Sequence, residues 1–313
     1  MNKSELKRMV NLLIYDTIII GGGIAGLQSA IQLGRYKHNV LVIDAGEGRS
    51  SICHCYHNVL GYPDGVSGPE LRSLGRKHAE KLGAEFAKDQ AVTAEKTDEG
   101  FMIGTESGRL YQGKTLMIST GIMDRLPPFP ELMPCLGMSV YVCPDCDGYE
   151  VSGRETVVMG SGNPGANMAL TLNYWTSKLT YVNHEGTAVD EEILAKMEEK
   201  GITYVKEPIK MVLADEADFS GVQLENGEMV KGERGFVAFG GNEVKSQLAR
   251  QLGVKLHTNK HILVNPRTKM TNVQNVWAGG DVVAHSEQVT IAMGDGMQAA
   301  IWIHKVLMGA ELE

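Results

Sequence analysis

Cysteine, positive charge and long apolar runs are all scarce in this sequence. Only five of the 313 residues are cysteine, which excludes a scaffold held together mainly by disulfides. The count is odd and includes a single C-x-x-C, a combination that favours a reducing compartment and one redox-active pair. We therefore expect a cytoplasmic protein.

The charge and hydropathy patterns exclude two further classes of protein. The formal net charge of −8 argues against a nucleic acid or an anionic membrane as partner, since both select a basic face. No stretch reaches the about 18 uninterrupted apolar residues of a transmembrane span. The apolar run at 11–20 resembles a signal peptide, but Asp16 interrupts it and no small-residue cleavage site follows.

Two stretches show the pattern of a strand, a glycine-rich turn, a helix and a second strand. In the first, we expect a strand at 15–20, a turn at 21–26, a helix at 27–36 and a strand at 39–43 that leads to Asp44. The length and the 43% hydrophobic content are enough for about two domains of this kind.

The second stretch repeats the first after a proline-rich break at 127–130. A strand is expected at 156–159, a turn at 160–165, a helix at 166–176 and a strand at 178–182. In both stretches the residue after the second strand lies equally far beyond the last glycine of the turn. The repeat predicts two nucleotide-binding folds in one chain.

Further elements are expected around these two units. They are a helix at 67–82, short antiparallel segments at 85–111, a strand at 116–121, a helix at 191–200 capped by Asp190, a strand near 262–264 and a helix at about 288–307. The predicted fold class is α/β, with two Rossmann-like three-layer nucleotide-binding domains, the second inserted into the first.

The first glycine turn has the G-x-G-x-x-G spacing of a dinucleotide site. Gly21 permits the tight turn, Gly23 lets a pyrophosphate approach the backbone, and Gly26 allows close packing of helix and strand. The phosphates then meet the free N–H groups of the helix N-terminus. Asp44, after the second strand, is placed to accept a ribose hydroxyl. The alternative is that the glycines serve loop geometry alone.

A Gly-Asp pair near the C-terminal end supports a flavin as the bound dinucleotide. Gly280 and Asp281 follow an apolar strand, and an aspartate there can accept hydrogen bonds from the linker of a flavin. The alternative is that Asp281 only caps the last helix.

The C-x-x-C motif is Cys143-Pro144-Asp145-Cys146, followed by Asp147 and Gly148. Such a pair can cycle between dithiol and disulfide, with a thiolate as the attacking group. The alternative is half of a zinc site, but no second C-x-x-C or nearby histidine pair completes four ligands. We expect no metal.

Together these motifs resemble the low-molecular-weight thioredoxin reductase family of flavin-dependent disulfide oxidoreductases. The resemblance extends from Tyr15 over nearly the whole chain. It rests on the two glycine turns, on Ser119-Thr120-Gly121, on the C-x-x-C-D-G and on Ala278-Gly279-Gly280-Asp281-Val282. It implies a homodimer with a discontinuous FAD-binding domain, 1–123 and 244–313, and an inserted NAD(P)H-binding-like domain, 124–243, that carries the cysteines.

The resemblance also implies roles for individual residues. Cys146 would face the flavin, Cys143 would exchange with the external disulfide, and Asp147 would protonate the departing thiolate. The FAD contacts implied are Gly21, Gly23, Ile24, Ala25, Gly26, Asp44, Ala45, Arg49, His57, Asn58, Val92, Thr120, Gly121, Gly280, Asp281, Gln288 and Val289. Asp145 departs from the usual apolar or small residue between the cysteines and should disfavour the thiolate.

The second nucleotide site departs further from the family. Its residues would be Gly160, Gly162, Asn163, Gly165 and Glu185. Members that use NADPH carry a basic cluster after the second strand, whereas no arginine occurs here between Arg154 and Arg234, and Glu185 would repel a 2′-phosphate. Pro164 also removes an N–H at the start of the helix.

These departures leave three interpretations of the second fold. It could bind NADH, with Glu185 or Asn183 on the ribose. It could hold nothing, with ferredoxin as electron donor or with oxygen as acceptor in a dithiol oxidase. It could hold a second FAD, as in a diflavin-linked branch of the family.

Two other segments differ from the family pattern. Glu287 stands where an arginine usually precedes the glutamine, and the stretch from Asp44 to Arg49 replaces a Gly-Gly-Gln. Cys53 and Cys55 are expected to be buried thiols in a loop, since a C-x-C disulfide is strained. The alternative is that they form a second redox pair, and His57 and Asn58 could touch the flavin or a substrate. Cys135 is expected to be inert as well.

The predicted function is an FAD-dependent, thioredoxin reductase-like disulfide oxidoreductase, acting on a thioredoxin-like protein or a small dithiol or disulfide without ordinary NADPH use. An NADPH- or NADH-dependent thioredoxin reductase is the alternative within the family. A non-catalytic, flavin-binding redox sensor is the alternative of another class.

Overall fold

The computed structural model describes residues 13–310, and residues 1–12 and 311–313 lie outside it. They include the ends of the predicted FAD-binding domain and two residues of the run at 11–20. The chain divides into two compact units. Unit 1 contains the residues up to Ser51, then Glu70–Met123, then those from Val244 on; unit 2 contains Ile52–Pro69 and Asp124–Glu243.

The assignment of Ile52–Pro69 to unit 2 differs from the sequence-based domain boundaries. The backbone of this segment bonds to unit 2, with His54 N donating to Leu136 O at 3.0 Å. A Cβ at Gly137 would lie 2.9 Å from Cys55 N, so glycine permits this close approach. Such a long-range pairing leaves no signal in local sequence periodicity.

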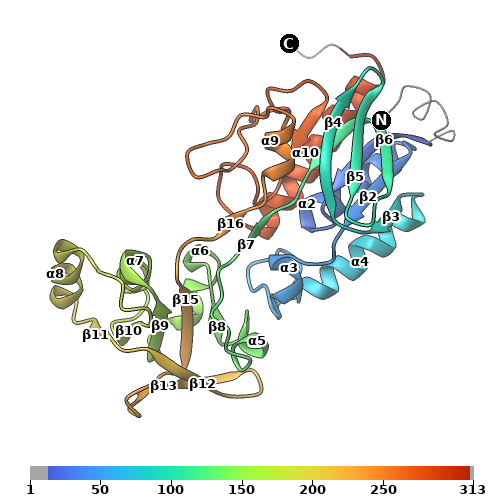
Figure 1. Cartoon of the computed structure of the whole chain (residues 1–313). Helices are drawn as coiled ribbons and strands as arrows, with labels where there is room; N and C mark the ends of the chain where they lie inside the picture. The colour runs from blue at the N-terminus through green and yellow to red at the C-terminus, as the bar shows by residue number, and fades with distance from the viewer. Residues whose placement is uncertain (1–12, 311–313) are drawn as a thin grey trace. The chain divides into compact units, whose positions relative to one another are not determined.

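A seven-stranded sheet forms the centre of unit 1 (Figure 1). Strands β3, β2, β1 and β6 are parallel neighbours in that order. On the edge of β6 away from β1, β17 pairs parallel with the end of β6, and β5 pairs antiparallel with its start and is followed by β4. The bounds are β1 Ile14–Ile20, β2 Val40–Asp44, β3 Glu85–Lys88, β4 Ala91–Thr97, β5 Gly100–Thr105, β6 Leu110–Ile118 and β17 Val276–Ala278.

Alternate residues of the central strands face opposite layers, as the period of two requires. Ile19 packs with α2 (Ile24–Arg35) and α10 (Val289–Leu307), which lie side by side in Figure 1. Ile18 packs on the other side, with residues of β5 and α9 (Gln247–Gln251). Helix α4, Gly68–Lys81, packs against α2 through Gly75.

Unit 2 has a five-stranded parallel sheet of order β11-β10-β9-β15-β8. Helices α7 and α8 cover one face, and a three-stranded antiparallel sheet, β12-β13-β14, covers the other. The bounds are β8 Val140–Tyr141, β9 Thr156–Gly160, α7 Gly162–Leu172, β10 Leu179–Asn183, α8 Glu191–Glu199, β11 Thr203–Val205, β12 Ile209–Asp215, β13 Asp218–Leu224, β14 Met229–Lys231 and β15 Arg234–Ala238.

The short elements complete the list. They are α3 Arg49–Ile52, β7 Ile122–Met123, α5 Leu132–Cys135, α6 Pro144–Asp147, the 3-10 helix η1 Gly148–Val151, and β16 Glu243–Val244, which pairs with β7. Within residues 13–310, no helix has both the length and the apolar character needed to span a bilayer.

The α/β class and both strand–turn–helix–strand units are confirmed, and the differences lie at element boundaries. Helices α2 and α7 begin inside the predicted turns, because the turn glycines themselves enter the first helical turn. Strand β3 pairs parallel to β2 and not antiparallel. The predicted strand near 262–264 is reduced to isolated bridges at Ile262.

Candidate functional site

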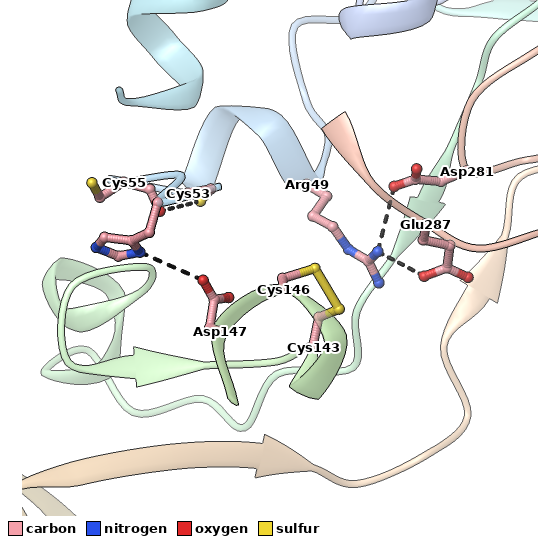
Figure 2. Close-up of a disulfide and its surroundings, with 9 residues drawn as sticks. Arg49, Cys53, Cys55, Cys143, Cys146, Asp147, Asp281 and Glu287 are labelled. Atoms are coloured by element: carbon pink, nitrogen blue, oxygen red, sulfur yellow. Dashed lines mark hydrogen bonds and ion pairs between the residues drawn. A yellow bond between two sulfur atoms is a disulfide. The ribbon is translucent and has the colours of Figure 1, made fainter. Parts of the chain in front are cut away.

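A disulfide joins Cys143 and Cys146 in unit 2 (Figure 2). The Cα atoms lie 5.3 Å apart, on either side of the start of the one-turn helix α6. Pro144 occupies the first helical position, where its missing N–H costs nothing. The N–H groups of Cys146 and Asp147 donate to Cys143 O at 3.2 and 3.0 Å. The C-P-D-C sequence thus forms a compact turn around its own disulfide.

Asp147 is the buried carboxylate next to the disulfide, with a side chain only 14% exposed. Figure 2 shows its carboxylate facing the loop that carries Cys53 and Cys55. Its Oδ1 lies 3.5 Å from Nδ1 of His57, which belongs to that loop. Burial raises the pKa of the Asp147 carboxyl, and His57 opposes this rise. A carboxyl of this kind holds its proton to a higher pH than an exposed one.

The loop cysteines Cys53 and Cys55 are both free thiols in this structure. Cys53 Sγ donates to Cys55 O at 3.2 Å, and neither cysteine forms a disulfide. Burial raises the pKa of Cys53 to about 12 and also raises that of Cys55. Burial raises the pKa of Cys135 as well. Since the thiolate is the reactive form, all three are poor nucleophiles at neutral pH.

The first glycine turn joins β1 to α2 in unit 1. Gly21 has φ +101°, a left-handed conformation that favours glycine, and a Cβ on Gly26 would overlap Gly21 O. Ser119, at the end of β6, donates its hydroxyl to Gly21 O at 2.9 Å. Backbone conformation and packing therefore explain the first and third glycines of the motif.

Gly23 is different, because nothing in the described chain requires glycine there. Its φ is −77° and no atom would lie within 4 Å of an added Cβ. It is the N-cap of α2, whose first N–H groups receive no side-chain cap. Open space beside uncapped N–H groups fits the pyrophosphate of a bound dinucleotide.

Other predicted FAD contacts lie at the ends of the parallel strands of unit 1. Asp44 ends β2 and accepts from Arg72 at 2.8 Å. Thr120 and Gly121 follow β6, and Thr120 donates to Lys245 O at 2.5 Å. Ala45 follows Asp44; Ile24 and Ala25 begin α2; Gln288 is the N-cap of α10 and Val289 its first residue.

Three predicted contacts lie elsewhere. Val92 is in β4, the strand at the far edge of the sheet, where its carbonyl accepts from Gln251 at 3.0 Å. His57 and Asn58 group with unit 2.

Arg49 and Asp281 meet through an ion pair that includes Glu287 (Figure 2). Arg49 Nη1 lies 2.7 Å from Glu287 and 3.4 Å from Asp281. His261 approaches the other oxygen of Glu287 at 3.3 Å. The two departures from the family pattern, an arginine at 49 and a glutamate at 287, thus pair with each other.

Asp295 holds the Gly280 turn and was not predicted. It lies on α10 with 3% side-chain exposure, and its carboxylate accepts from Gly280 N at 2.9 Å and His285 Nε2 at 2.6 Å. Lys269 Nζ lies 2.7 Å from the other oxygen. An aspartate within an apolar helix, at 289–307, was the available sequence signal.

The second glycine turn is occupied by its own neighbours. Tyr181 donates to Gly162 O at 2.8 Å, and a Cβ on Gly165 would overlap the Tyr181 ring. Asn183 is fully buried; it accepts from Gly162 N at 3.1 Å and donates to Thr187 O and Tyr204 Oη at 2.7 and 2.9 Å. Both N–H groups of the Asn183 side chain are therefore taken, and its burial keeps it from a ribose.

The segment 183–190, at the end of β10 and after it, also forms hydrogen bonds with residues of the second glycine turn. Ser161 donates to Thr187 Oγ1 at 2.9 Å. Asn163 donates to the carboxylate of Asp190 at 2.8 Å, so Asp190 stands at the N-cap of α8 without capping it through its side chain, contrary to expectation. A Cβ on Gly160 would lie 2.5 Å from Ala238 O, so close packing explains that glycine.

Glu185 forms an ion pair with Arg125, a residue that sequence analysis did not single out. The neighbouring Ser161 hydroxyl and the Arg125 guanidinium lower the pKa of the Glu185 carboxyl. A negative charge therefore already lies beside this turn. Among the described residues, no group of three or more His, Cys, Asp or Glu side chains is placed to hold a metal ion.

The family model for pyridine nucleotide-disulphide oxidoreductases matches residues 15–296. The chain belongs to this family. It is 28% identical over 309 residues to a thioredoxin reductase of Rickettsia bellii, covering 93% of this chain and 97% of the relative. It is 30% identical over 308 residues to a 34.2 kDa protein in the rubredoxin operon of Clostridium pasteurianum, covering 94% and 97%.

A solved structure shows the same fold at lower identity. The thioredoxin reductase from Streptococcus pyogenes MGAS5005 superposes with a TM-score of 0.83 at 23% identity, covering 95% of this chain and 99% of that one. The chain is thus a thioredoxin reductase-like flavoenzyme and disulfide oxidoreductase, with FAD as its cofactor. The open N-terminus of α2 fits that group.

Proposed function

We propose that the chain passes two electrons between FAD and the Cys143–Cys146 disulfide, and on to a thioredoxin-like protein or a small dithiol or disulfide, without ordinary NADPH use. In this proposal 1–123 and 244–313 bind FAD, and 124–243 carry the redox pair. The observation that carries the proposal is the occupied second glycine turn.

FAD would supply two-electron redox chemistry that the side chains lack. Gly23 would admit its pyrophosphate to the N-terminus of α2, in a turn shaped by Gly21 and Gly26, and Asp44 would accept from its ribose. Asp281 would accept from its linker. Arg49 holds Asp281 and Glu287 by charge, which keeps two neighbouring carboxylates from repelling each other.

The thiol chemistry belongs to unit 2. An external thiolate would attack Cys143, and Cys146 would leave as a thiolate. Asp147 would give this thiolate its proton, because burial keeps the carboxyl protonated to a higher pH than usual.

Charge is the first argument against NADPH at the second turn. A 2′-phosphate needs a cation. Of the cations beside this segment, Arg125 is already paired with Glu185, and Lys206 lies against Gly186. Bringing a phosphate to this place would set it against the Glu185 carboxylate. No arginine follows Glu185 in the sequence until Arg234.

Space is the second argument, and it applies to NADH and to a second FAD as well. The segment 183–190 covers the turn through Asn183, Thr187 and Asp190. The pocket beside the turn has a volume of about 170 Å³ and is bordered by Pro164, Gly240 and Arg125. This volume is below the roughly 300–1,000 Å³ of pockets that hold drug-sized molecules, and we therefore expect a dinucleotide to require a wider pocket here.

The partner at the flavin is then a carrier such as ferredoxin, or oxygen if the enzyme runs as a dithiol oxidase. A thioredoxin-like protein is the proposed partner at Cys143, in line with the relative from Rickettsia bellii. A homodimer and a cytoplasmic location complete the proposal.

The deciding experiment is anaerobic reduction of the purified, FAD-loaded protein. NADPH, NADH, dithiothreitol and dithionite are added separately, and the flavin absorbance at about 450 nm is followed. We expect bleaching by dithiothreitol and dithionite and none by either nucleotide. Rapid bleaching by NADPH or NADH would show that the segment 183–190 opens and would refute loss of nucleotide use.

Cys143→Ser tests the catalytic part separately. This variant should keep FAD but lose bleaching by dithiothreitol, while dithionite still works, because the disulfide can no longer form. Cys135→Ala, in the same unit, is the matched control and should behave like the parent. A Cys143→Ser protein with unchanged function would favour the redox sensor.

A further inference from the structure

The His57–Asp147 contact gives the loop segment of unit 2 a part in the thiol chemistry. His57 Nδ1 is buried and has no hydrogen-bond partner within the described residues, yet it lies 3.5 Å from Asp147 Oδ1. An unsatisfied buried donor is costly unless it serves a partner. The available partner is the carboxylate that follows Cys146.

We infer that His57 is a positioning residue for the disulfide exchange, orienting the Asp147 carboxyl and balancing the negative charge left when that carboxyl gives its proton to Cys146. The inference rests on the proposed function of the Cys143–Cys146 pair. It adds a residue from a segment far away in sequence to the exchange machinery.

The surroundings define the charges that act on the pair. Asp147 faces His57 on the loop and Glu150 on η1. His57 faces Asp147, Glu150 and Arg234 of β15, and its ring lies edge-on to Tyr141 of β8 at 6.4 Å between centroids. The thiols of Cys53 and Cys55 also lie within reach of the Asp147 charge.

Burial has the largest effect on the pKa of Asp147, and His57 is the group that opposes it. The contact with Asp147 raises the pKa of His57, with Glu150 adding to the rise and burial opposing it. In return, His57 lowers the pKa of Asp147, while burial and Glu150 raise it. A cation next to a proton donor stabilises the anion that remains.

The exchange with an external dithiol balances without any other reactant. One dithiol sulfur, as a thiolate, bonds to Cys143 Sγ; the Cys143–Cys146 bond breaks and its electron pair stays on Cys146. The Asp147 carboxyl proton passes to Cys146, and the resulting carboxylate is paired by His57. The second dithiol sulfur, after losing its proton to water, then attacks its partner sulfur, releasing Cys143 as a thiolate and an external disulfide. The dithiol is oxidised by two electrons and the cysteine pair is reduced.

The test measures this exchange directly in the FAD-loaded protein. Oxidised protein is mixed with dithiothreitol under anaerobic conditions, quenched with acid, and alkylated, and newly formed thiols are counted by mass spectrometry. Rates are divided by thiolate concentration across the pH range. The variants are His57→Gln, Asp147→Asn and the double variant, with His54→Gln as control, since His54 is an exposed histidine of the same loop.

Asp147→Asn should slow exchange about 100-fold and remove the pH limb of the acid, since a general acid contributes roughly 10²–10⁴. His57→Gln should slow it about tenfold and move that limb to higher pH, because the carboxyl becomes a weaker acid. In the double variant His57→Gln should cause no further loss, because His57 acts through Asp147. His54→Gln should match the parent.

Equal slowing by His57→Gln with and without Asp147, or an unmoved limb, would overturn the inference. A second readout does not depend on turnover: the proton NMR titration of His57 should move to lower pH in Asp147→Asn. An unchanged titration would also overturn it. Cys143→Ser distinguishes failure of the proposed function from failure of this inference. If exchange persists in Cys143→Ser, the proposed function is refuted. If exchange is lost in Cys143→Ser but Asp147→Asn has no effect, only the role given to Asp147 and His57 is refuted.

Discussion

Single buried charges in this protein are stabilised by specific partners. Asp295 is the clearest case, since it is 3% exposed and meets His285, Lys269 and Gly280 N. Burial by itself raises the pKa of the Asp295 carboxyl, but these partners outweigh burial and hold the pKa below its usual value. The Asp295 contact is the main cause that raises the pKa of His285.

The pH dependence of the stability of this cluster follows from the lowered pKa of Asp295 and the raised pKa of His285. The lowered pKa of Asp295 stabilises the fold above about pH 4, and this contribution is lost as pH falls through the folded-state pKa. The raised pKa of His285 stabilises it below about pH 6.5, and this contribution is lost as pH rises through its folded-state pKa. Both contributions are present in the window between.

Asp295→Asn should therefore lower the free energy of unfolding of unit 1 by about 3–5 kcal/mol, the range for breaking a buried pair. The loss should be largest between about pH 4 and 6.5 and smaller at alkaline pH, where Lys269 is the remaining charged partner. Urea unfolding at several pH values measures it. Asp98→Asn, an exposed aspartate between β4 and β5, is the control and should change little.

At the scale of elements, the turn between β1 and α2 contains two kinds of glycine: some are required by backbone conformation and packing, and one leaves space for the ligand. Gly26 packs against Gly21 O, whereas Gly23 faces open space with an ordinary φ. The same comparison at the second turn gives another result. There Gly165 packs against Tyr181, and the remaining polar groups are taken by the segment 183–190.

Gly23→Ala should change the unfolding free energy of the FAD-free protein by less than about 1 kcal/mol. The only expected cost is that alanine is a weaker N-cap residue than glycine. It should weaken FAD binding more than about tenfold (about 1.4 kcal/mol), since the Cβ occupies the phosphate space. Gly26→Ala should instead destabilise the protein by about 1–3 kcal/mol through overlap with backbone. Flavin fluorescence titration and urea unfolding separate the two effects, and equal behaviour of the two variants would contradict this assignment.

At the scale of the whole molecule, two units have separate hydrophobic cores, and each contains a glycine turn. The turn of unit 1 is open, and the turn of unit 2 is filled by neighbouring side chains. Cores on both faces of each sheet are formed within each unit. Ligand binding should therefore stabilise the two units differently, because only the unit that binds gains free energy.

FAD at 100 times its dissociation constant should stabilise unit 1 by about 2.7 kcal/mol. NADPH and NADH at about 1 mM should leave the unfolding free energy of unit 2 unchanged. At this concentration a ligand with a Kd of about 10 μM would give the same gain as FAD. Calorimetry of the FAD-free protein with each ligand measures both shifts. A rise in the transition of unit 2 with NADPH would show an open second site.

The sequence alone determined the α/β class, the two repeated strand–turn–helix–strand units and the C-x-x-C pair. These follow from local signals, namely hydrophobic periodicity, glycine spacing and the turn around Pro144, which act over a few residues. Element boundaries were less well predicted where a glycine, such as Gly162, belongs to both turn and helix.

Only the tertiary structure decided what surrounds those motifs. It brought His57 to Asp147, paired Arg125 with Glu185 and Arg49 with Glu287, and laid Thr187 over Ser161. Such contacts join segments distant in sequence and depend on packing and on the pairing of buried polar groups, for which spacing along the chain carries no signal. The same G-x-G-x-x-G spacing therefore gave one open turn and one filled turn.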